Sequence, residues 1–333
     1  MPPQNKTPKT INRGYLIAAI SALFLSSTSI IIRYMTLTYQ IPALILAFWR
    51  NVFVVSTLVI AFSFLNKQLV KVTRNQFIFL IWFGLVVSVF NSFWTLSVAI
   101  NGAAVATVLV YCSAAFTALL GWWLLKEKLT WVKGVSVVLS LGGCVLVSEA
   151  YQPGMWSSNF AGISIGVLAG LSYAGYSLLG RTASNKGLNP WTTLLYSFGF
   201  AGIFLLFFNL IPGDFFFGKA VRAADLLWLG NRLDGWIILI LLAAIPTLAG
   251  FGFYNVSLSY LPSSIANLIA TLEPVFTVTS AYLILGERLS FDQMIGGGLI
   301  VSGVVFLRLF ENNRTRNQKI NLEVVIQDEN KNA

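Results

Sequence analysis

The chain has 333 residues, of which 56% are hydrophobic and only 10% are charged, and its mean hydropathy is +0.76. Soluble domains carry about 25% charged residues, so this composition excludes an ordinary soluble domain and indicates a membrane protein. The net charge is +10. Whether this excess serves nucleic acid or a membrane depends on where the basic residues lie.

Apolar segments follow one another along the chain, each long enough to cross a hydrocarbon core of about 30 Å, which takes about 20 helical residues. We predict an all-α integral membrane protein with ten transmembrane helices at 14–34, 41–65, 76–99, 103–125, 131–149, 160–180, 190–211, 235–259, 263–285 and 292–310. The first segment also has the basic flank of a cleaved signal peptide, but the internal repeat described below assigns it to the fold.

The basic residues lie mainly in the loops on one side of the predicted membrane. With the N-terminus in the cytoplasm, 16 of the 22 Lys and Arg fall on that side, and the five on the other side are Arg33, Lys219, Arg222, Arg232 and Arg288. This asymmetry is the positive-inside pattern, which predicts a cell (inner or plasma) membrane protein with both termini in the cytoplasm. The charge therefore needs no nucleic-acid partner to explain it.

A weak internal repeat relates the two halves. With an offset of 148 residues, Gly14, Ser29, Arg33 and Pro42 fall on Gly162, Ser177, Arg181 and Pro190. With an offset of 160, FTALLGWWLLKEKLT at 116–130 falls on FTVTSAYLILGERLS at 276–290. Each half then contains five predicted helices, and because five is odd the second half crosses the membrane in the opposite sense.

The inverted repeat predicts both a domain division and a function class. The division is a cytoplasmic tail at 1–13, a first five-helix repeat at 14–149, a periplasmic linker at 150–160, a second repeat at 161–310 and a cytoplasmic tail at 311–333. Secondary transporters are often built from such repeats, with a binding site near the middle of the membrane. The alternative is that duplication merely builds a stable bundle.

Several segments together resemble the drug/metabolite transporter superfamily, specifically its EamA-type members. They are GYLIAAISALFLSSTSIIIRY and its repeat GISIGVLAGLSYAGYSLLGR, ILAFWRN with Arg50, LEPVFTVTSAYLILGERLS, and QMIGGGLIVSGVVFL. The likeness covers residues 14–310, with one departure: helix four reads YCSAAF where the family usually carries a proline. The resemblance implies a facilitative or proton-coupled carrier of small metabolites, often an exporter of amino acids. Other members move sugars, nucleotide conjugates or cationic drugs, and substrate identity does not follow from the fold.

Two charged residues lie well inside predicted spans, Arg50 in helix two and Glu273 in helix nine. An ionisable group at the centre of a membrane helix costs about 2.5–3.5 kcal/mol on insertion scales, and it usually faces a partner or a wet cavity. Glu273 has three interpretations: proton coupling, recognition of a cationic substrate, or structural pairing with an arginine or a helix end. Because arginine keeps its proton in proteins, Arg50 either anchors helices, which we favour, or binds an anion.

Pro274 follows Glu273 directly, and a proline inside a helix removes a backbone donor and tends to kink the helix. At about 100° per residue, Asn267, Thr271 and Pro274 share one face of helix nine, and Glu273 points about 120° away from it. We expect this face to meet its counterpart on helix four, so that the substrate site is lined by Thr107, Tyr111, Asn267 and Thr271. The alternative is that the hydroxyls bond their own backbone.

Helices three, six and eight carry further candidates, in which polar groups stand beside aromatic rings. Such pairs suit an amphipathic metabolite, or a cation held against a ring. Small residues in these helices also favour close helix packing without any role in binding. The predicted substrate-binding residues here are Asn91, Trp94 and Thr95, then Tyr173 and Tyr176, and then Tyr254 and Asn255.

The residue inventory argues against catalysis. The chain has no histidine, which excludes Ser-His hydrolysis and HExxH zinc sites, and no P-loop appears. We therefore expect no enzyme activity, no metal and no cofactor, with a small-molecule substrate and the lipid bilayer as partners. The competing class is a non-transporting polytopic membrane scaffold. Transport direction, coupling ion and oligomeric state, including a homodimer, stay open.

Overall fold

The structure is a computed structural model that describes residues 8–65, 67–147, 151–152, 160–211, 218–277, 279 and 290–310. Every regular element in these residues is a helix. Eight of the described helices are long and apolar enough to cross a membrane, and 131–146 is a shorter apolar helix. The prediction of an all-helical fold built from membrane-spanning segments is confirmed.

The helices follow the predicted spans, but the fourth, eighth and ninth spans are divided. α3 (Arg74–Tyr111) contains the predicted third span and the first half of the fourth, whose second half is α4 (Ser113–Leu125). The eighth span consists of α8 (Leu233–Leu242), a π-helical turn η3 (Ala243–Thr247) around Pro246, and α9 (Leu248–Tyr260). The other elements are α1 (Pro8–Thr38), α2 (Ala43–Leu65), η1 (Lys67–Val70), α5 (Trp131–Val147), α6 (Phe160–Asn185), α7 (Pro190–Leu210), η2 (Ala223–Leu227), α10 (Ser263–Ala270) and a C-terminal helix, Phe291–Phe310. The predicted linker, both tails and the end of the ninth span lie partly or wholly outside the described residues.

Local sequence explains where two helices begin and where one bends. Thr73 and Gln76 form a capping box at the start of α3, in which each side chain accepts a hydrogen bond from the other residue's amide. Asn189 caps α7, and Pro190 occupies the first helical position, where a missing N–H costs nothing. Inside α3 the chain leaves helical geometry at Gly102, whose φ of 80° is readily adopted only by glycine. This bend separates the third span from the fourth.

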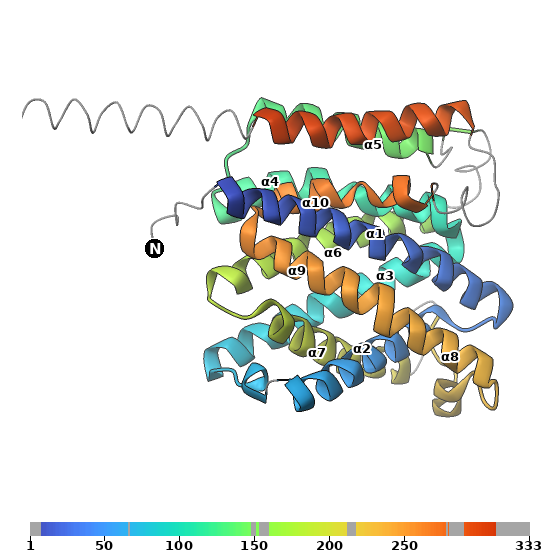
Figure 1. The fold of residues 1–333 in the computed structure, drawn as a ribbon. Coiled ribbons are helices and arrows are strands. Elements are labelled where there is room, and N and C mark those ends of the chain that lie inside the picture. Colours follow the sequence, from blue (N-terminus) through green and yellow to red (C-terminus); the bar gives the residue numbers. More distant parts are fainter. Residues whose placement is uncertain are drawn as a thin grey trace, which may run out of the picture.

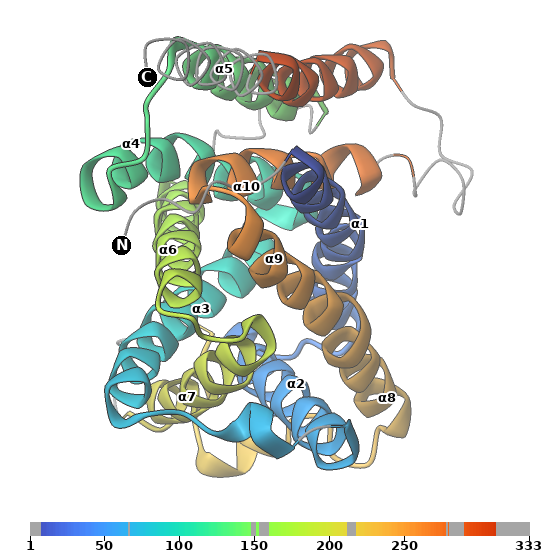
Figure 2. The same ribbon diagram turned by 60° about the vertical axis from the view of Figure 1, so that its left-hand side comes forward.

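The helices pack in layers, which Figures 1 and 2 show from two directions. α5 and the C-terminal helix lie side by side at one edge of the molecule. Next to them come α1, α4 and α10, and then α3, α6 and α9 in the middle. α2, α7 and α8 lie at the opposite edge. The middle layers therefore combine helices from both halves of the sequence.

α5 and the C-terminal helix approach each other closely at two glycines that the repeat matches. A Cβ on Gly143 would lie 2.6 Å from the carbonyl oxygen of Gly296, and one on Gly303 would lie 3.0 Å from that of Ser136. Small residues allow this backbone approach, as is common between membrane helices. Packing, rather than conformational freedom, requires glycine at both positions.

Two arginines that the repeat matches also make matching contacts. Arg33 Nη1 donates to the carbonyl oxygen of Ala99 at 2.7 Å, and Arg181 Nη1 donates to that of Leu258 at 2.7 Å. Ala99 and Leu258 lie near the ends of the third and eighth spans. The same residue type therefore makes the same kind of bond in both halves, which supports the predicted repeat.

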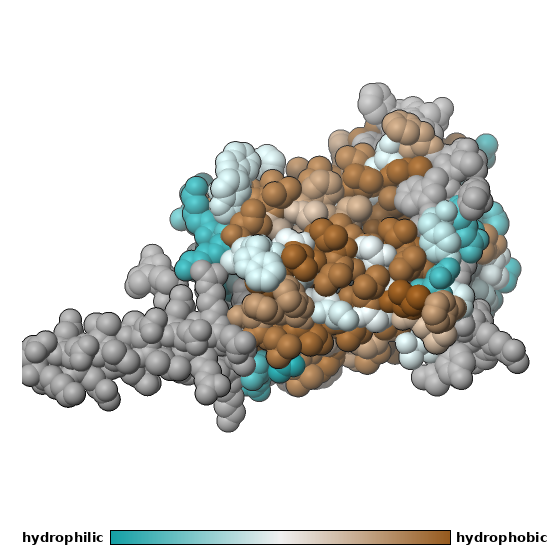
Figure 3. Space-filling view, turned by 90° about the horizontal axis from the view of Figure 1, so that it is seen from above, coloured by the Kyte–Doolittle hydropathy of each residue, from teal (hydrophilic) through white to brown (hydrophobic). Residues whose placement is uncertain are grey.

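The surface is apolar in the middle and polar at its ends. Figure 3 shows hydrophobic residues across the centre of the face on the α5 side, with hydrophilic residues gathered at both ends. Val138 of α5 is 70% exposed and Val301 of the C-terminal helix is 42% exposed. An apolar belt of this kind matches hydrocarbon rather than water.

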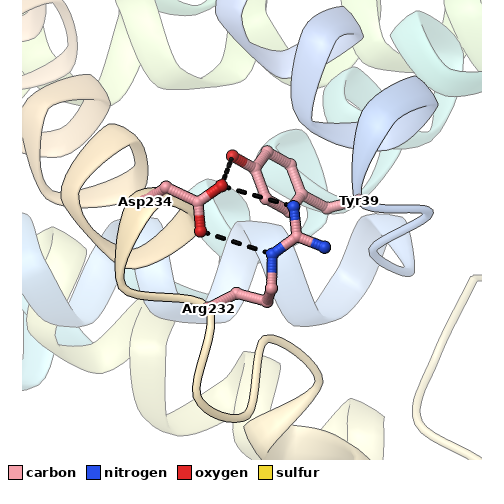
Figure 4. A network of polar contacts seen from close by, with 3 residues as sticks. All are labelled: Tyr39, Arg232 and Asp234. Atoms are coloured by element: carbon pink, nitrogen blue, oxygen red, sulfur yellow. Dashed lines mark hydrogen bonds and ion pairs between the residues drawn. The ribbon is translucent and has the colours of Figure 1, made fainter.

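A polar cluster joins the end of α1 to the start of α8 (Figure 4). Tyr39 Oη donates to Asp234 Oδ2 at 2.7 Å, and Arg232 Nη2 lies 3.3 Å from the same oxygen. The hydrogen bond to the Asp234 carboxylate raises the pKa of Tyr39 to about 12. Because the Arg232 and Asp234 side chains are 62% and 55% exposed, this ion pair contributes little to stability.

Candidate functional site

The predicted fourth and ninth spans are interrupted at matching positions. In the fourth, α3 ends at Tyr111 and α4 begins at Ser113; in the ninth, α10 ends at Ala270 and the helix resumes at Glu273. Pro274 is the second residue of the resumed helix, where its missing N–H needs no partner. The fourth span is interrupted at the equivalent place although it has no proline. The break therefore belongs to the packing of both spans rather than to proline alone.

These two breaks place Tyr111 and Glu273 against each other. Tyr111 Oη donates to Glu273 Oε2 at 2.5 Å, and the two residues are 1% and 5% exposed. Both line a cavity of about 20 Å³, together with Leu25, Thr28, Phe90, Trp94, Val110, Tyr173 and Phe251. A cavity of this size holds about one water molecule. The cavity in this structure is therefore too small for an organic metabolite.

Aromatic side chains make up much of the lining of this cavity. The rings of Phe90 and Tyr173 stack with centroids 5.0 Å apart, and Tyr173 lies 5.5 Å from Tyr254. Trp94 is buried beside them. A carboxylate facing several rings suits a solute that has both an apolar body and a polar or cationic group.

Asn267 is the centre of a buried hydrogen-bond network that joins three helices. Its Oδ1 accepts from Ser113 Oγ at 3.0 Å, and its Nδ2 donates to Ser177 Oγ at 3.1 Å and to Tyr254 Oη at 3.4 Å. Ser177 Oγ and Tyr254 Oη are 2.8 Å apart. Asn267 therefore serves the contact between α4, α6 and α9, and it lies behind the cavity rather than among its lining residues.

The remaining predicted residues of this region bond to other core residues or to their own helices. Tyr176 Oη donates to Asn255 Oδ1 at 3.0 Å in the buried core. Thr107 and Thr271 donate to carbonyl oxygens of their own helices at 2.7 and 2.6 Å. Their hydroxyls thus follow the backbone-bonding alternative considered for the sequence.

Arg50 lies in a separate buried cluster between α2 and α3. It is 0% exposed, and its Nη2 donates to Asn91 Oδ1 at 2.6 Å. Asn91 Nδ2 in turn donates to Asn51 Oδ1 at 3.2 Å. Among the described residues, no hydrogen-bond acceptor meets Arg50 Nε or Nη1. The side chain of Thr95, one turn further along α3 from Asn91, is fully buried as well.

Glu127, in the repeated segment FTALLGWWLLKEKLT, forms a contact that the sequence does not predict. Its Oε1 accepts from the amide and hydroxyl of Ser263 at 2.7 and 2.6 Å, and its Oε2 accepts from those of Ser264 at 3.2 and 2.5 Å. Lys133 Nζ donates to Ser264 Oγ at 2.9 Å. The carboxylate thus caps the first turn of α10, where free amides and the helix dipole favour negative charge. The sequence signal was SS after a proline, a usual start of a helix, but nothing in it named the acceptor.

A larger groove of about 920 Å³ lies elsewhere, between α1, the end of α9, the end of α10 and the C-terminal helix. Its lining is mostly apolar, with Arg13 and Arg308 among the polar residues. Apolar grooves edged by arginine are typical of lipid contact at a membrane surface. We therefore place the candidate site at the smaller cavity, where buried polar groups converge.

The described part of the chain offers groups suited to binding a solute. Among them, no group of three or more His, Cys, Asp or Glu residues is placed to hold a metal ion. The buried polar groups are a carboxylate, a guanidinium, the Lys133 ammonium group, amides and hydroxyls, on helices from both halves. Such groups select and orient a solute.

Comparison with known proteins is consistent with this arrangement. The sequence profile of the EamA-like transporter family matches residues 12–149 and 160–309. An uncharacterized transporter of Clostridium kluyveri is 23% identical over 330 residues, which cover 93% of this chain and 96% of that protein. A second, from Archaeoglobus fulgidus, is 29% identical over 144 residues, 43% of this chain and 46% of that protein. A probable amino-acid metabolite efflux pump of Salmonella typhimurium is 24% identical over 235 residues, 68% of this chain and 74% of that protein.

A solved crystal structure has the same arrangement of helices. It superposes with a TM-score of 0.68 over 90% of this chain and 98% of its own, at 13% sequence identity. At this identity the likeness concerns the fold alone.

Proposed function

Because the chain belongs to the EamA-like transporter family, we propose that this multi-pass membrane transporter carries a small organic metabolite, an amino acid or a related solute, by alternating access. The observation that carries the proposal is the buried Tyr111–Glu273 pair, which joins the two interrupted spans at a cavity lined by aromatic rings. Inverted-repeat transporters bind their solutes at such discontinuous helices. The relative named as a probable amino-acid metabolite efflux pump supports both the solute class and export.

The solute is proposed to occupy an enlarged form of the cavity. The lining residues Trp94, Tyr111 and Tyr173 contact its apolar part, and Glu273 faces its polar part. The residues behind the lining hold these groups in place: Asn91, Thr95, Thr107, Tyr176, Tyr254, Asn255, Asn267 and Thr271. Pro274 keeps the ninth span interrupted so that Glu273 stays at the cavity.

Glu273 is proposed either to couple proton movement to solute movement or to recognise a positive charge on the solute. Its only described side-chain partner is the neutral hydroxyl of Tyr111, so no described basic residue compensates its charge. A carboxylate paired in this way is able to exchange a proton or an ammonium group when water enters. A purely structural carboxylate would instead be held by an arginine or a helix end, as Glu127 is.

The membrane orientation is proposed from the charge distribution of the loops. Both termini lie in the cytoplasm of a cell whose inner or plasma membrane holds the protein, and the repeats occupy 14–149 and 161–310. In this orientation the Glu127–α10 contact lies at the cytoplasmic end of the bundle.

Purified protein in liposomes tests the proposal. A panel of amino acids, amines, sugars and organic acids is loaded, and saturable efflux is measured at two pH values with and without an imposed pH gradient. Glu273→Gln is expected to abolish the pH dependence or the flux, and Asp234→Asn, which removes an exposed carboxylate, serves as the control. Absence of saturable flux for every solute would leave the scaffold interpretation. An unchanged pH response in Glu273→Gln would overturn both roles given to Glu273.

A further inference from the structure

Arg50 is a buried charge for which the described residues supply no opposite charge. Its guanidinium is 0% exposed and makes one hydrogen bond, from Nη2 to the neutral amide oxygen of Asn91. Nε and Nη1 meet no acceptor among these residues. Of the ion pairs within 4.0 Å in the described part of the chain, Arg232–Asp234 is the one present, and it is exposed. Arg50 therefore has two donor groups with unused capacity.

A buried guanidinium in this state is energetically expensive, because burial removes its hydration and nothing replaces the lost charge interactions. Buried arginines in membrane proteins normally have an anionic partner or backbone acceptors. Arg33 and Arg181, which are half-buried, bond carbonyl oxygens. Arg50 is fully buried and has neither kind of partner among the described residues, and this difference points to a partner from outside them.

The position of Arg50 connects it to the cavity. Its partner Asn91 lies on α3 between Phe90 and Trp94, and both of these side chains line the cavity. Thr95, one turn beyond Asn91, has a buried Oγ1 with no partner among the described residues. Arg50 itself is on α2 and is not a lining residue. Its partner Asn91, the Thr95 hydroxyl and the lining residues Phe90 and Trp94 lie within two turns of α3.

We infer that Arg50 binds the carboxylate of the transported solute, so that the substrate is an organic acid or a zwitterion. This inference rests on the proposed function and narrows its substrate class. A planar guanidinium matches a carboxylate because two parallel N–H groups meet two oxygens. One buried positive charge balances a monoanion, whereas a phosphate dianion requires more positive charge than the described core supplies. For a zwitterion, Glu273 at the same cavity is the acceptor for the ammonium group.

The first test compares a solute that the liposome panel identifies with its carboxamide, which lacks the negative charge but keeps the size. In the unaltered protein the carboxamide is expected to compete about 10- to 100-fold more weakly, as is typical for loss of a hydrogen-bonded charge. In the Arg50→Gln variant, the carboxylate solute is expected to compete only as weakly as its carboxamide. Arg33→Gln, which removes an arginine bonded to a carbonyl, is the matched control and is expected to preserve the preference.

The second test supplies the missing charge from the protein. Asn91→Asp places a carboxylate at the atom that is 2.6 Å from Arg50 Nη2, so it should occupy the guanidinium and displace the solute. The variant is expected to remain folded by size-exclusion chromatography and thermal unfolding, and to lose transport of the carboxylate solute at least about tenfold.

The outcomes separate this inference from the proposed function. If the solute and its carboxamide compete equally well in saturable flux, the role of Arg50 is overturned and the proposed transport function stands. The same holds if folded Arg50→Gln and Asn91→Asp variants transport the carboxylate solute as the unaltered protein does. Competition by chloride or phosphate equal to that by the carboxylate solute identifies a general anion site and also overturns the inference. Absence of flux for every solute removes the proposed function, and the inference with it.

Discussion

Glu127 ties α10 to the loop between α4 and α5, so replacing its charge should weaken the contact between the two halves. The carboxylate accepts four hydrogen bonds, at 2.7, 2.6, 3.2 and 2.5 Å, from the amides and hydroxyls of Ser263 and Ser264. Glu127→Gln keeps one acceptor oxygen, exchanges the other for a donor, and removes the charge. Two of the four bonds are therefore lost, and the other two become neutral.

The expected magnitude follows from the contacts that are lost. A hydrogen bond to a charged group contributes about 1.5–3 kcal/mol, and a neutral one about 1 kcal/mol. The favourable interaction with the helix dipole adds about 0.3–1 kcal/mol at an exposed site. Because Glu127 is only half-buried, water replaces part of what is lost, and we expect a net loss of about 2–3 kcal/mol. Because the unfolding entropy is about 2 cal/mol/K per residue, this corresponds to a fall in melting temperature of about 3–4 °C for a chain of this length.

Thermal unfolding in detergent, followed by tryptophan fluorescence, measures this change. Lys128→Gln changes the charge of the exposed neighbouring side chain and is expected to shift stability by less than about 0.5 kcal/mol. Ser263→Ala should lower the free energy of unfolding by about 1 kcal/mol on its own. In the Glu127→Gln background it should lower it by less, because both changes affect the bond between the Ser263 hydroxyl and Glu127. A melting temperature for Glu127→Gln equal to that of the lysine control would refute the reasoning.

Three further predictions concern packing, the buried network and the polar cluster of Figure 4. Gly143→Val is expected to lower the free energy of unfolding by about 1–3 kcal/mol through overpacking. Gly142→Val should lower it much less, because a Cβ at that position meets nothing within 4 Å. Equal melting temperatures for the two variants would contradict the close approach of α5 and the C-terminal helix. Asn267→Ala should lower the free energy of unfolding by about 2–4 kcal/mol, because it leaves buried hydroxyls unpaired. A loss below about 1 kcal/mol in the same unfolding assay would show that Asn267 is not central to this hydrogen-bond network. Because the pKa of Tyr39 is raised to about 12, its bond to Asp234 stabilises the fold fully below about pH 10 and this stabilisation is lost as the pH rises through about 12. The difference in phenolate absorbance between the unaltered protein and Tyr39→Phe should show this late titration. Titration of Tyr39 near pH 10 would count against the bond.

Much of the fold was predictable because the local composition of a segment indicates whether it spans a membrane. The start of α2 and the end of α7 fall within two residues of the predicted bounds, and both are marked by loop residues next to apolar runs. The division of the fourth span was less predictable. YCSAAF has no proline and no glycine, yet the helix is interrupted after Tyr111. Only packing against neighbouring helices explains that break.

The candidate site was predictable in its residue types but not in its contacts. Tyr111 was expected to line the substrate site, and Glu273 was left with three interpretations; their 2.5 Å bond joins residues 162 positions apart. The helical-wheel argument placed Asn267 and Thr271 at the site and turned Glu273 away from them. In the structure Glu273 lines the cavity, and Asn267 is not among the lining residues. A helical wheel gives the angle between residues of one helix, but which face meets the cavity depends on how that helix packs against its neighbours.

By itself the sequence determined the membrane class, the order and approximate limits of the spans, and the presence of an arginine and a glutamate within them. These follow from length, hydropathy and charge, which act on each segment separately. Only the tertiary structure decided that Glu273 meets Tyr111, that Glu127 caps α10, and that Arg50 has no opposite charge among the described residues. The partner of a buried polar group depends on the rotation and depth of helices that lie far apart in the chain, and no local pattern encodes these.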